Sequence, residues 1–259
     1  MRRVNGIGCF KDCMVLFLGF MLGIGVSNVC AQSADERVRL SDDVEVRKLA
    51  EGVWRHTTYF DISGFENVPA NGLIVIDGDN AMMIDLPWTD EQTGVLFDWV
   101  TKEHKAVIKR VIPTHSHIDC AGGLAEAHRR KADSFALDKT VEILKRTNKP
   151  VPKNWFSKRM CLSCGDTRVE LAFLGGGHTV DNIVAWIPEK KILFGGDLVR
   201  ARNARNLGNI IEADLKNWPE TLKKVKETYS EAKIVVPGHG GHGGPELIER
   251  TIELCKNRR

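Results

Sequence analysis

The sequence predicts an α/β protein arranged as a four-layer αββα sandwich, with helices on the outer faces of two packed sheets. Short apolar runs separated by turn residues come first, and amphipathic segments then alternate with further apolar runs, twice over. This alternation favours packed sheets covered by helices. A length of 259 residues without a repeat or a low-complexity linker fits one large domain.

The first series opens with predicted strands and continues with a helix. Apolar residues recur at helical spacing between Asp90 and His104, which predicts a helix there. The sequence Asp77-Gly78-Asp79 is typical of a hairpin turn between two of the strands. The predicted strands are 44–49, 53–59, 72–76, 81–84 and 107–112, and further helices are predicted at 123–130 and 139–146.

The second series repeats the pattern with strands, a helix, a strand and a closing helix. Its apolar runs are short and end in glycine-rich or acidic turns, as strands do. The predicted strands are 169–173, 182–187, 191–194 and 233–236, and the predicted helices are 217–228 and 245–255.

The amino terminus has the organisation of a secretory signal peptide. Basic residues precede an apolar run at 14–26, and small residues end at Ala31. We therefore expect residues 1–31 to be cleaved and residues 32–259 to form the domain, in the periplasm or outside the cell. An uncleaved membrane anchor is the alternative, but the run is short for a span of about 20 residues. After cleavage we expect no stable membrane insertion.

Composition limits the other function classes. Lys and Arg number 37 against 34 Asp and Glu, and no basic stripe stands out, so we expect no nucleic-acid partner. Cys161 and Cys164 form a single C-x-x-C sequence, which by itself is a weak zinc signal. A strained local disulfide and two free thiols both remain open for this pair.

The strongest local pattern is Thr114-His115-Ser116-His117-Ile118-Asp119, after a predicted strand and before a predicted helix. In an extended segment, residues two apart share a face, so His115, His117 and Asp119 would point the same way. Imidazole and carboxylate are zinc ligands, and one segment can supply two adjacent metals. The alternative is a polar loop with chance histidines.

Three further turns place ligand types after apolar runs. His178 follows three glycines, Asp197 follows Gly195-Gly196, and His239 follows Pro237-Gly238. Taken singly, a turn aspartate or a surface histidine would explain each of them. Together with the first motif they favour a two-metal site, with Thr179 and Asp181 as candidates to orient His178.

The remaining histidines and the cysteine beside the motif receive simpler interpretations. We interpret His56, His104 and His128 as surface residues, and His242 as a neighbour of His239 outside the ligand set. Cys120 is interpreted as a residue of the pocket wall or as one that supports the ligands from behind, since it lies directly beside Asp119 and does not replace a ligand by position.

Between residues 44 and 255 the chain resembles the metallo-β-lactamase superfamily, most closely the di-zinc β-lactamase branch with His/His/His and Asp/Cys/His sites. Besides H-x-H-x-D, the resemblance rests on five motifs: Asn71-Gly72-Leu73-Ile74-Val75, Asp85-Leu86-Pro87-Trp88-Thr89-Asp90, Gly177-His178-Thr179, Asn206-Leu207-Gly208-Asn209 and Pro237-Gly238-His239-Gly240. It implies two zinc ions per chain, the first held by His115, His117 and His178.

The resemblance also implies the second zinc site, held by Asp119 and His239, and a set of substrate contacts. Residues 60–69 resemble the branch's flexible covering loop, with Phe60 and Phe65 at its tip. Arg200 stands where the branch places a lysine that pairs with the substrate carboxylate, and Asn209 where it places an asparagine near the substrate carbonyl. Trp88 belongs to a motif that is also shared.

One position departs from that branch: Asp197 stands where the branch has a cysteine ligand. Many other members of the superfamily have an aspartate there that bridges both metals. The resemblance therefore implies hydrolysis of a β-lactam amide by a metal-activated hydroxide, with Asp119 and Asn209 as catalytic residues, and antibiotic resistance as the outcome. Hydrolysis of a thioester, lactone or phosphodiester on the same fold is the alternative, and a non-enzymatic zinc protein is a more distant one.

Overall fold

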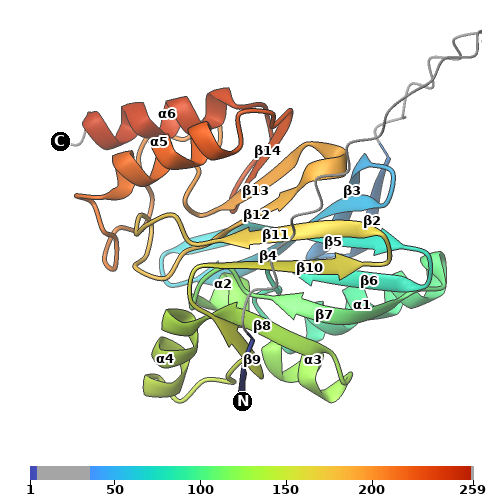
Figure 1. Cartoon of the computed structure of the whole chain (residues 1–259). Coiled ribbons are helices and arrows are strands. Elements are labelled where there is room, and N and C mark those ends of the chain that lie inside the picture. Colours follow the sequence, from blue (N-terminus) through green and yellow to red (C-terminus); the bar gives the residue numbers. More distant parts are fainter. Residues whose placement is uncertain (5–35, 258–259) are drawn as a thin grey trace, which may run out of the picture.

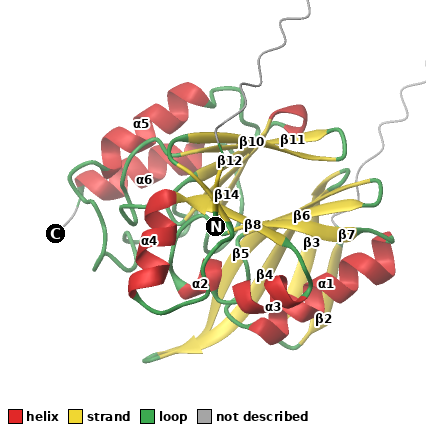
Figure 2. Ribbon diagram, turned by 60° about the horizontal axis from the view of Figure 1, so that its bottom comes forward, coloured by secondary structure: helices red, strands yellow, loops and turns green. Residues whose placement is uncertain are grey.

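The computed structural model describes residues 1–4 and 36–257. Two β-sheets pack face to face in the centre of the molecule, one with nine strands and one with five. Helices cover the outer faces: α1 (Asp90–His104) and α3 (Leu124–Arg129) lie on one side, α5 (Trp218–Thr228) and α6 (Glu246–Lys256) on the other (Figures 1 and 2). The predicted αββα sandwich is therefore confirmed.

The larger sheet has the strand order β1-β9-β8-β7-β6-β5-β4-β3-β2. From β2 to β6 neighbouring strands run antiparallel, and β6 to β9 run parallel. The strands are β1 (Arg2–Arg3), β2 (Arg37–Ser41), β3 (Val44–Ala50), β4 (Val53–Ile62), β5 (Phe65–Asp77), β6 (Asn80–Ile84), β7 (Val107–Ile112), β8 (Asp133–Leu137) and β9 (Asn154–Phe156).

The smaller sheet has the order β10-β11-β12-β13-β14, antiparallel except for the last pair. Its strands are β10 (Arg159–Cys164), β11 (Thr167–Ala172), β12 (Val184–Ile187), β13 (Ile192–Gly196) and β14 (Ile234–Pro237). Because β13 and β14 are parallel, their carboxyl ends meet at one edge, where the loops that follow them lie side by side.

Three apolar clusters hold the layers together. One fills the space between the sheets, with Phe194 and Met82 fully buried in it. The second joins the larger sheet to α1 through Leu96 and Val100. The third joins the smaller sheet to α5 and α6 around Trp218, which has no exposed surface. Burial of these faces is what fixes the helices on the outside of the sandwich.

Helix α1 shows why local signals placed an element correctly. Thr89 caps its amino terminus by accepting a hydrogen bond from the Gln92 backbone N–H. The negative charges of Asp90 and Glu91 interact favourably with the positive end of the helix dipole. Lys105 ends the helix in the left-handed conformation. The predicted bounds of α1 and of β7 agree with the structure, whereas β2, β8, β9, β10 and the short helix α2 (Ile118–Ala121) were not predicted.

The predicted signal peptide lies mostly outside the described residues, which lack 5–35. Arg2 and Arg3 are described and pair in parallel with Asn154 and Trp155 of β9. No helix in the described ranges is both long and apolar enough to cross a membrane.

Two interpretations of single residues are decided by the fold. Cys161 and Cys164 lie three residues apart on β10, so their side chains face opposite sides of the strand, and they form no disulfide with each other. His56 was expected at the surface, which is wrong. Its ring is buried over Gly72 and fills the space that a side chain at that position would need. Its Nε2 atom lies 3.1 Å from the Asp85 carbonyl oxygen.

Candidate functional site: two clusters of metal-binding side chains

The predicted ligand residues come from loops at one edge of the two sheets. His115 and His117 follow β7, and Asp119 belongs to α2. His178 lies between β11 and β12, Asp197 comes directly after β13, and His239 comes after β14. The structure therefore brings together all six residues, although they span nearly half of the chain, from His115 to His239.

His115, His117 and His178 form the first cluster, and one nitrogen of each lies within 4.8 Å of the others. The His178 Nε2 atom is 3.1 Å from His117 Nδ1. The three rings meet edge to face, with centroids 4.6 to 5.1 Å apart. Three imidazoles that converge in this way are a common protein ligand set for zinc with an open fourth position.

Asp119, Asp197 and His239 form the second cluster. The His239 Nε2 atom is 3.1 Å from Asp119 Oδ2 and 3.0 Å from Asp197 Oδ2. Asp197 Oδ2 is also 3.3 Å from Nε2 of His178 in the first cluster. A single carboxylate oxygen of Asp197 is therefore in contact with both clusters.

The segment that carries the first motif is not extended throughout, because helix α2 begins at Ile118. An extended segment would have placed His115, His117 and Asp119 on one face. In the structure α2 begins after His117, and Asp119 contacts His239 in the second cluster. Asp119 nevertheless stays beside His115, with their ligand atoms within 4.8 Å of each other, so the predicted convergence holds for this pair and one segment supplies both clusters.

Unpartnered ring nitrogens support metal binding at these residues. His115 is fully buried, and neither of its nitrogens has a hydrogen-bond partner among the residues described. A buried imidazole without partners is costly, and coordination of a metal would satisfy it. His239 donates from Nδ1 to the Pro69 carbonyl, so Nε2 is the nitrogen that faces the two carboxylates and would bind a metal.

The electrostatics of the clusters give His178 and Asp197 the charge states that metals require, whereas His239 must lose a proton first. Burial lowers the pKa of His178 to about 4, so its ring is neutral. Burial alone would raise the pKa of Asp197, but the adjacent His239 and His178 outweigh burial and hold that pKa well below its usual range. Burial opposes the charge on His239, yet Asp197 and Asp119 raise its pKa, so metal binding there would release a proton.

A pocket of about 870 Å³ opens over both clusters. The β4–β5 hairpin forms one wall through Ile62 and Phe65, and the loop after β13 forms the other through Arg200 and Asn209. Phe65 is 66% exposed at the rim. Phe60 does not line the pocket but stacks on Trp88, with ring centroids 5.7 Å apart, and Trp88 is part of the wall.

Two residues that hydrogen-bond to the ligand segments were not predicted, and the expected hydrogen bonds to His178 are not formed in the described part of the chain. Asp85 is buried behind the site, where it accepts hydrogen bonds from the Thr114 N–H (2.6 Å) and hydroxyl (2.9 Å), just before His115. Thr179 and Asp181 were expected to orient His178, but no hydrogen bond joins either side chain to a partner among the residues described. Asp85 belongs to a shared motif, and that was the signal available for it in the sequence.

Glu212 is the second unpredicted residue, and its Oε2 atom lies 2.7 Å from His117 Nε2. Nothing in the sequence around Glu212 marks it, because it is brought to His117 by a loop 95 residues further along the chain. Cys120 was expected in the pocket wall or behind the ligands; it is not among the lining residues, but its Sγ atom lies within 4.8 Å of the ligand atoms of His115 and Asp119. The Cys120 side chain is buried near Thr114. Its burial is the largest cause, and the charges of the nearby carboxylates the next, that raise the pKa of its thiol well above the usual value.

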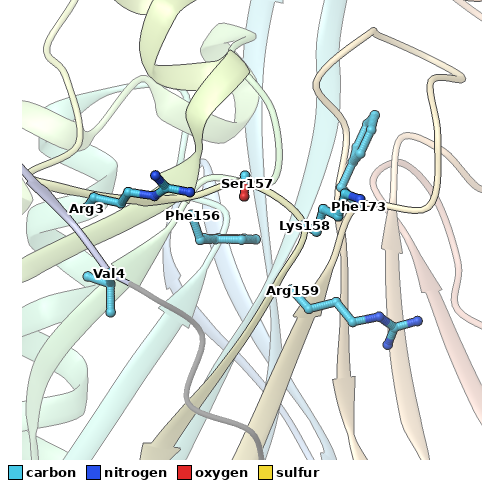
Figure 3. Close-up of a pocket in the computed structure, with 7 residues that line it drawn as sticks. All are labelled: Arg3, Val4, Phe156, Ser157, Lys158, Arg159 and Phe173. Carbon is cyan, nitrogen blue, oxygen red and sulfur yellow. The ribbon is translucent and has the colours of Figure 1, made fainter.

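A smaller pocket lies elsewhere, at the end of β9 and the start of β10 (Figure 3). It is lined by Arg3, Val4, Phe156, Ser157, Lys158, Arg159 and Phe173. None of these side chains is a metal ligand or a carboxylate, so this pocket offers no comparable chemistry.

Comparisons with known proteins agree with this geometry. The family model of the metallo-β-lactamase superfamily matches residues 67–239. The metallo-β-lactamase type 2 of Bacteroides fragilis is 40% identical over 224 residues, covering 86% of this chain and 90% of that protein. The type 2 enzyme of Pseudomonas aeruginosa is 36% identical, covering 82% and 84%.

Solved structures give the same result. A metallo-β-lactamase from Pontibacter korlensis has a TM-score of 0.80 at 38% identity and matches 83% of this chain and 100% of its own. One from Hirschia baltica has a TM-score of 0.77 at 31% identity, covering 82% and 98%. The chain therefore belongs to the metallo-β-lactamase superfamily. Within it, this protein is a zinc-binding hydrolase of the metallo-β-lactamase type.

Proposed function

We propose that this protein hydrolyses the amide bond of β-lactams with two zinc ions, one at each cluster. The observation that carries the proposal is the pair of adjacent ligand sets beneath one open pocket, His115/His117/His178 and Asp119/Asp197/His239. The names of its relatives, which share 30 to 40% of their residues with this chain, support a β-lactam as the substrate. Resistance to β-lactam antibiotics would follow from this activity.

Arg200 would hold the substrate carboxylate. Its Nε atom is buried without a partner in the described chain, and its guanidinium lies against Gly208, where a Cβ would come within 2.9 Å of a guanidinium nitrogen. Gly208 has a φ of +75°, which favours glycine and keeps this close approach open. A guanidinium can pair with a carboxylate through two parallel hydrogen bonds.

Asn209 would polarise the lactam carbonyl. Its Oδ1 atom accepts a hydrogen bond from the Ile211 N–H at 3.1 Å, which leaves the amide NH₂ as the group able to donate into the pocket. A donor aimed at the carbonyl oxygen gains strength as negative charge develops there. The Trp88 ring and the hairpin residue Phe65 would exclude water from the bound ring.

Zinc, when bound, supplies an activated water at neutral pH and Lewis-acid stabilisation of the developing charge. The chain itself would move the proton. Asp119 is buried and lies in contact with His239. Its carboxylate would accept a proton from the attacking water and return that proton to the leaving nitrogen. The result is a cleaved amide, with a new carboxylate and a secondary amine.

Asp197 favours a second candidate on the same site. Its carboxylate oxygen contacts both clusters, and a hard oxygen ligand there also suits hydrolysis of thioesters, lactones or phosphodiesters. The deciding experiment is one activity panel on the zinc-loaded protein: a chromogenic cephalosporin, a thioester, a lactone and a phosphodiester. Turnover of the cephalosporin that disappears with a chelator and in His115→Ala supports the first proposal. Turnover confined to another substrate class would replace it with the second.

The predicted signal peptide leads to a separate proposal on location. We propose that residues 1–31 are removed and that the domain from residue 32 works in the periplasm or outside the cell. Amino-terminal sequencing of the protein recovered from a periplasmic fraction would test this. A chain that retains Met1, found in the membrane fraction, would contradict it.

A further inference from the structure

His117 lies between the first metal-binding cluster and a carboxylate outside the cluster. Its Nδ1 atom is 3.1 Å from Nε2 of His178, inside the cluster. Its Nε2 atom, on the far side of the ring, is 2.7 Å from Oε2 of Glu212. A carboxylate oxygen accepts hydrogen bonds, so Nε2 is the nitrogen placed to donate, and in the neutral tautomer that a metal requires Nδ1 then presents its lone pair to the cluster.

The other two histidines of the cluster lack such support on their outward nitrogens. Both nitrogens of His115 and the Nδ1 atom of His178 have no hydrogen-bond partner among the described residues. A carboxylate that accepts from the free nitrogen of a metal-binding histidine fixes the tautomer and ring orientation, and it makes the ligand more basic. His117 is thus the ligand whose orientation depends most on one outside residue.

The loop that carries Glu212 is the one that carries Asn209. The loop is fastened near Glu212, because the Asp214 N–H donates to the Gly177 carbonyl at 2.8 Å, next to His178. Between Asn209 and Glu212 the chain turns tightly, with the Ala213 N–H donating to the Ile210 carbonyl. Glu212 therefore joins the substrate-facing loop to the first cluster through its side chain.

We propose that Glu212 is a positioning residue for the first metal site. It accepts the Nε2–H hydrogen bond of His117, holds the ring with Nδ1 toward the metal, and strengthens His117 as a ligand. The same bond keeps the Asn209 loop at a set distance from the metal. This inference rests on the proposed zinc site, but it assigns a role to a residue that is itself no ligand.

The test compares Glu212→Ala and Glu212→Gln with Glu220→Gln as a matched control. Glu220 is equally exposed, at 59% of its side chain, and pairs with Lys223 on α5. Zinc affinity is measured by competition with a chromophoric chelator. We expect Glu212→Ala to weaken the tighter zinc site by about 10–100-fold, the range typical of such outer partners. Glu212→Gln keeps a hydrogen-bond acceptor but no charge, so its loss of zinc affinity should be smaller. Glu220→Gln should bind zinc as tightly as the wild type.

A second measurement separates positioning from general stability. In ¹H–¹⁵N spectra of the zinc-loaded protein, the His117 Nε2–H signal should be visible in the wild type and in Glu212→Gln. It should be lost to solvent exchange in Glu212→Ala, while the melting temperature of the metal-free protein stays the same. If the wild type binds no zinc, the proposed function fails. If the wild type binds zinc and Glu212→Ala binds it equally tightly, only the role of Glu212 is overturned.

Discussion

The Oδ2 atom of Asp197 lies 3.0 Å from the Nε2 atom of His239, and this contact joins the end of β13 to the end of β14. Because the two strands are parallel neighbours, the contact follows from the register of the smaller sheet. The same oxygen also reaches His178, 3.3 Å away. A carboxylate at this position can therefore serve both clusters, whereas a thiolate would be expected to favour a soft metal at one of them.

The first prediction replaces that carboxylate by a thiolate. In Asp197→Cys we expect two metals to remain bound, with a tighter second zinc site, because soft sulfur prefers zinc. Cobalt-loaded samples provide the measurement. Thiolate-to-cobalt charge-transfer absorption should appear in the variant and be absent from the wild type. A variant that binds one metal and is inactive on every substrate would show that the bridging contact of Asp197 is required.

The second prediction concerns Arg200 as the anchor of the substrate carboxylate. Arg200→Ala should raise the KM for a carboxylate-bearing β-lactam by about 10–100-fold, equivalent to a charge-assisted hydrogen bond of roughly 1.5–3 kcal/mol. Arg202→Ala is the control, since Arg202 is 78% exposed and pairs with Glu246. Steady-state kinetics in which both variants keep the wild-type KM would remove Arg200 from the substrate site.

The third prediction uses the close approach of Gly238 to Asp197. A Cβ on Gly238 would lie 1.7 Å from Asp197 Oδ1 and 2.9 Å from the Asp197 backbone nitrogen. Gly238→Ala should therefore displace the carboxylate and lower the zinc content from two ions to one. Gly241→Ala is the matched control, because a Cβ there has no neighbour within 4 Å. Elemental analysis giving two zinc ions in both variants would contradict this account of the second cluster.

The fourth prediction is a pH dependence of stability from His56. Burial lowers the pKa of His56 from its usual 6.5 to about 4. Below pH 6.5 His56 binds a proton in the unfolded state but not in the folded state, so the free energy of unfolding should fall as pH drops from 6.5 toward 4. The total loss of unfolding free energy from this group is about 3 kcal/mol. Urea unfolding at pH 7 and pH 5 should show a smaller drop in His56→Gln than in the wild type, at equal zinc. An equal drop in both proteins would exclude His56 as the source.

The sequence by itself determined the fold class and the ligand residues. Apolar periodicity and capping residues act over a few neighbours, so α1 and β7 could be placed from local pattern alone. The ligand residues were recognisable for a similar reason, since His115, His178 and His239 each follow a strand or glycine turn within a short motif. Short strands such as β8 and β9 carry little periodicity, and their pairing with neighbours defines them.

Only the tertiary structure decided how those residues are shared between the two clusters. Helix α2 places Asp119 against His239 as well as near His115, and sheet register brings Asp197 against both His178 and His239. The burial of His56 and the contact of Glu212 with His117 are long-range in the same sense. Contacts between residues far apart in the chain depend on how the layers pack, and no local pattern in the sequence encodes that packing.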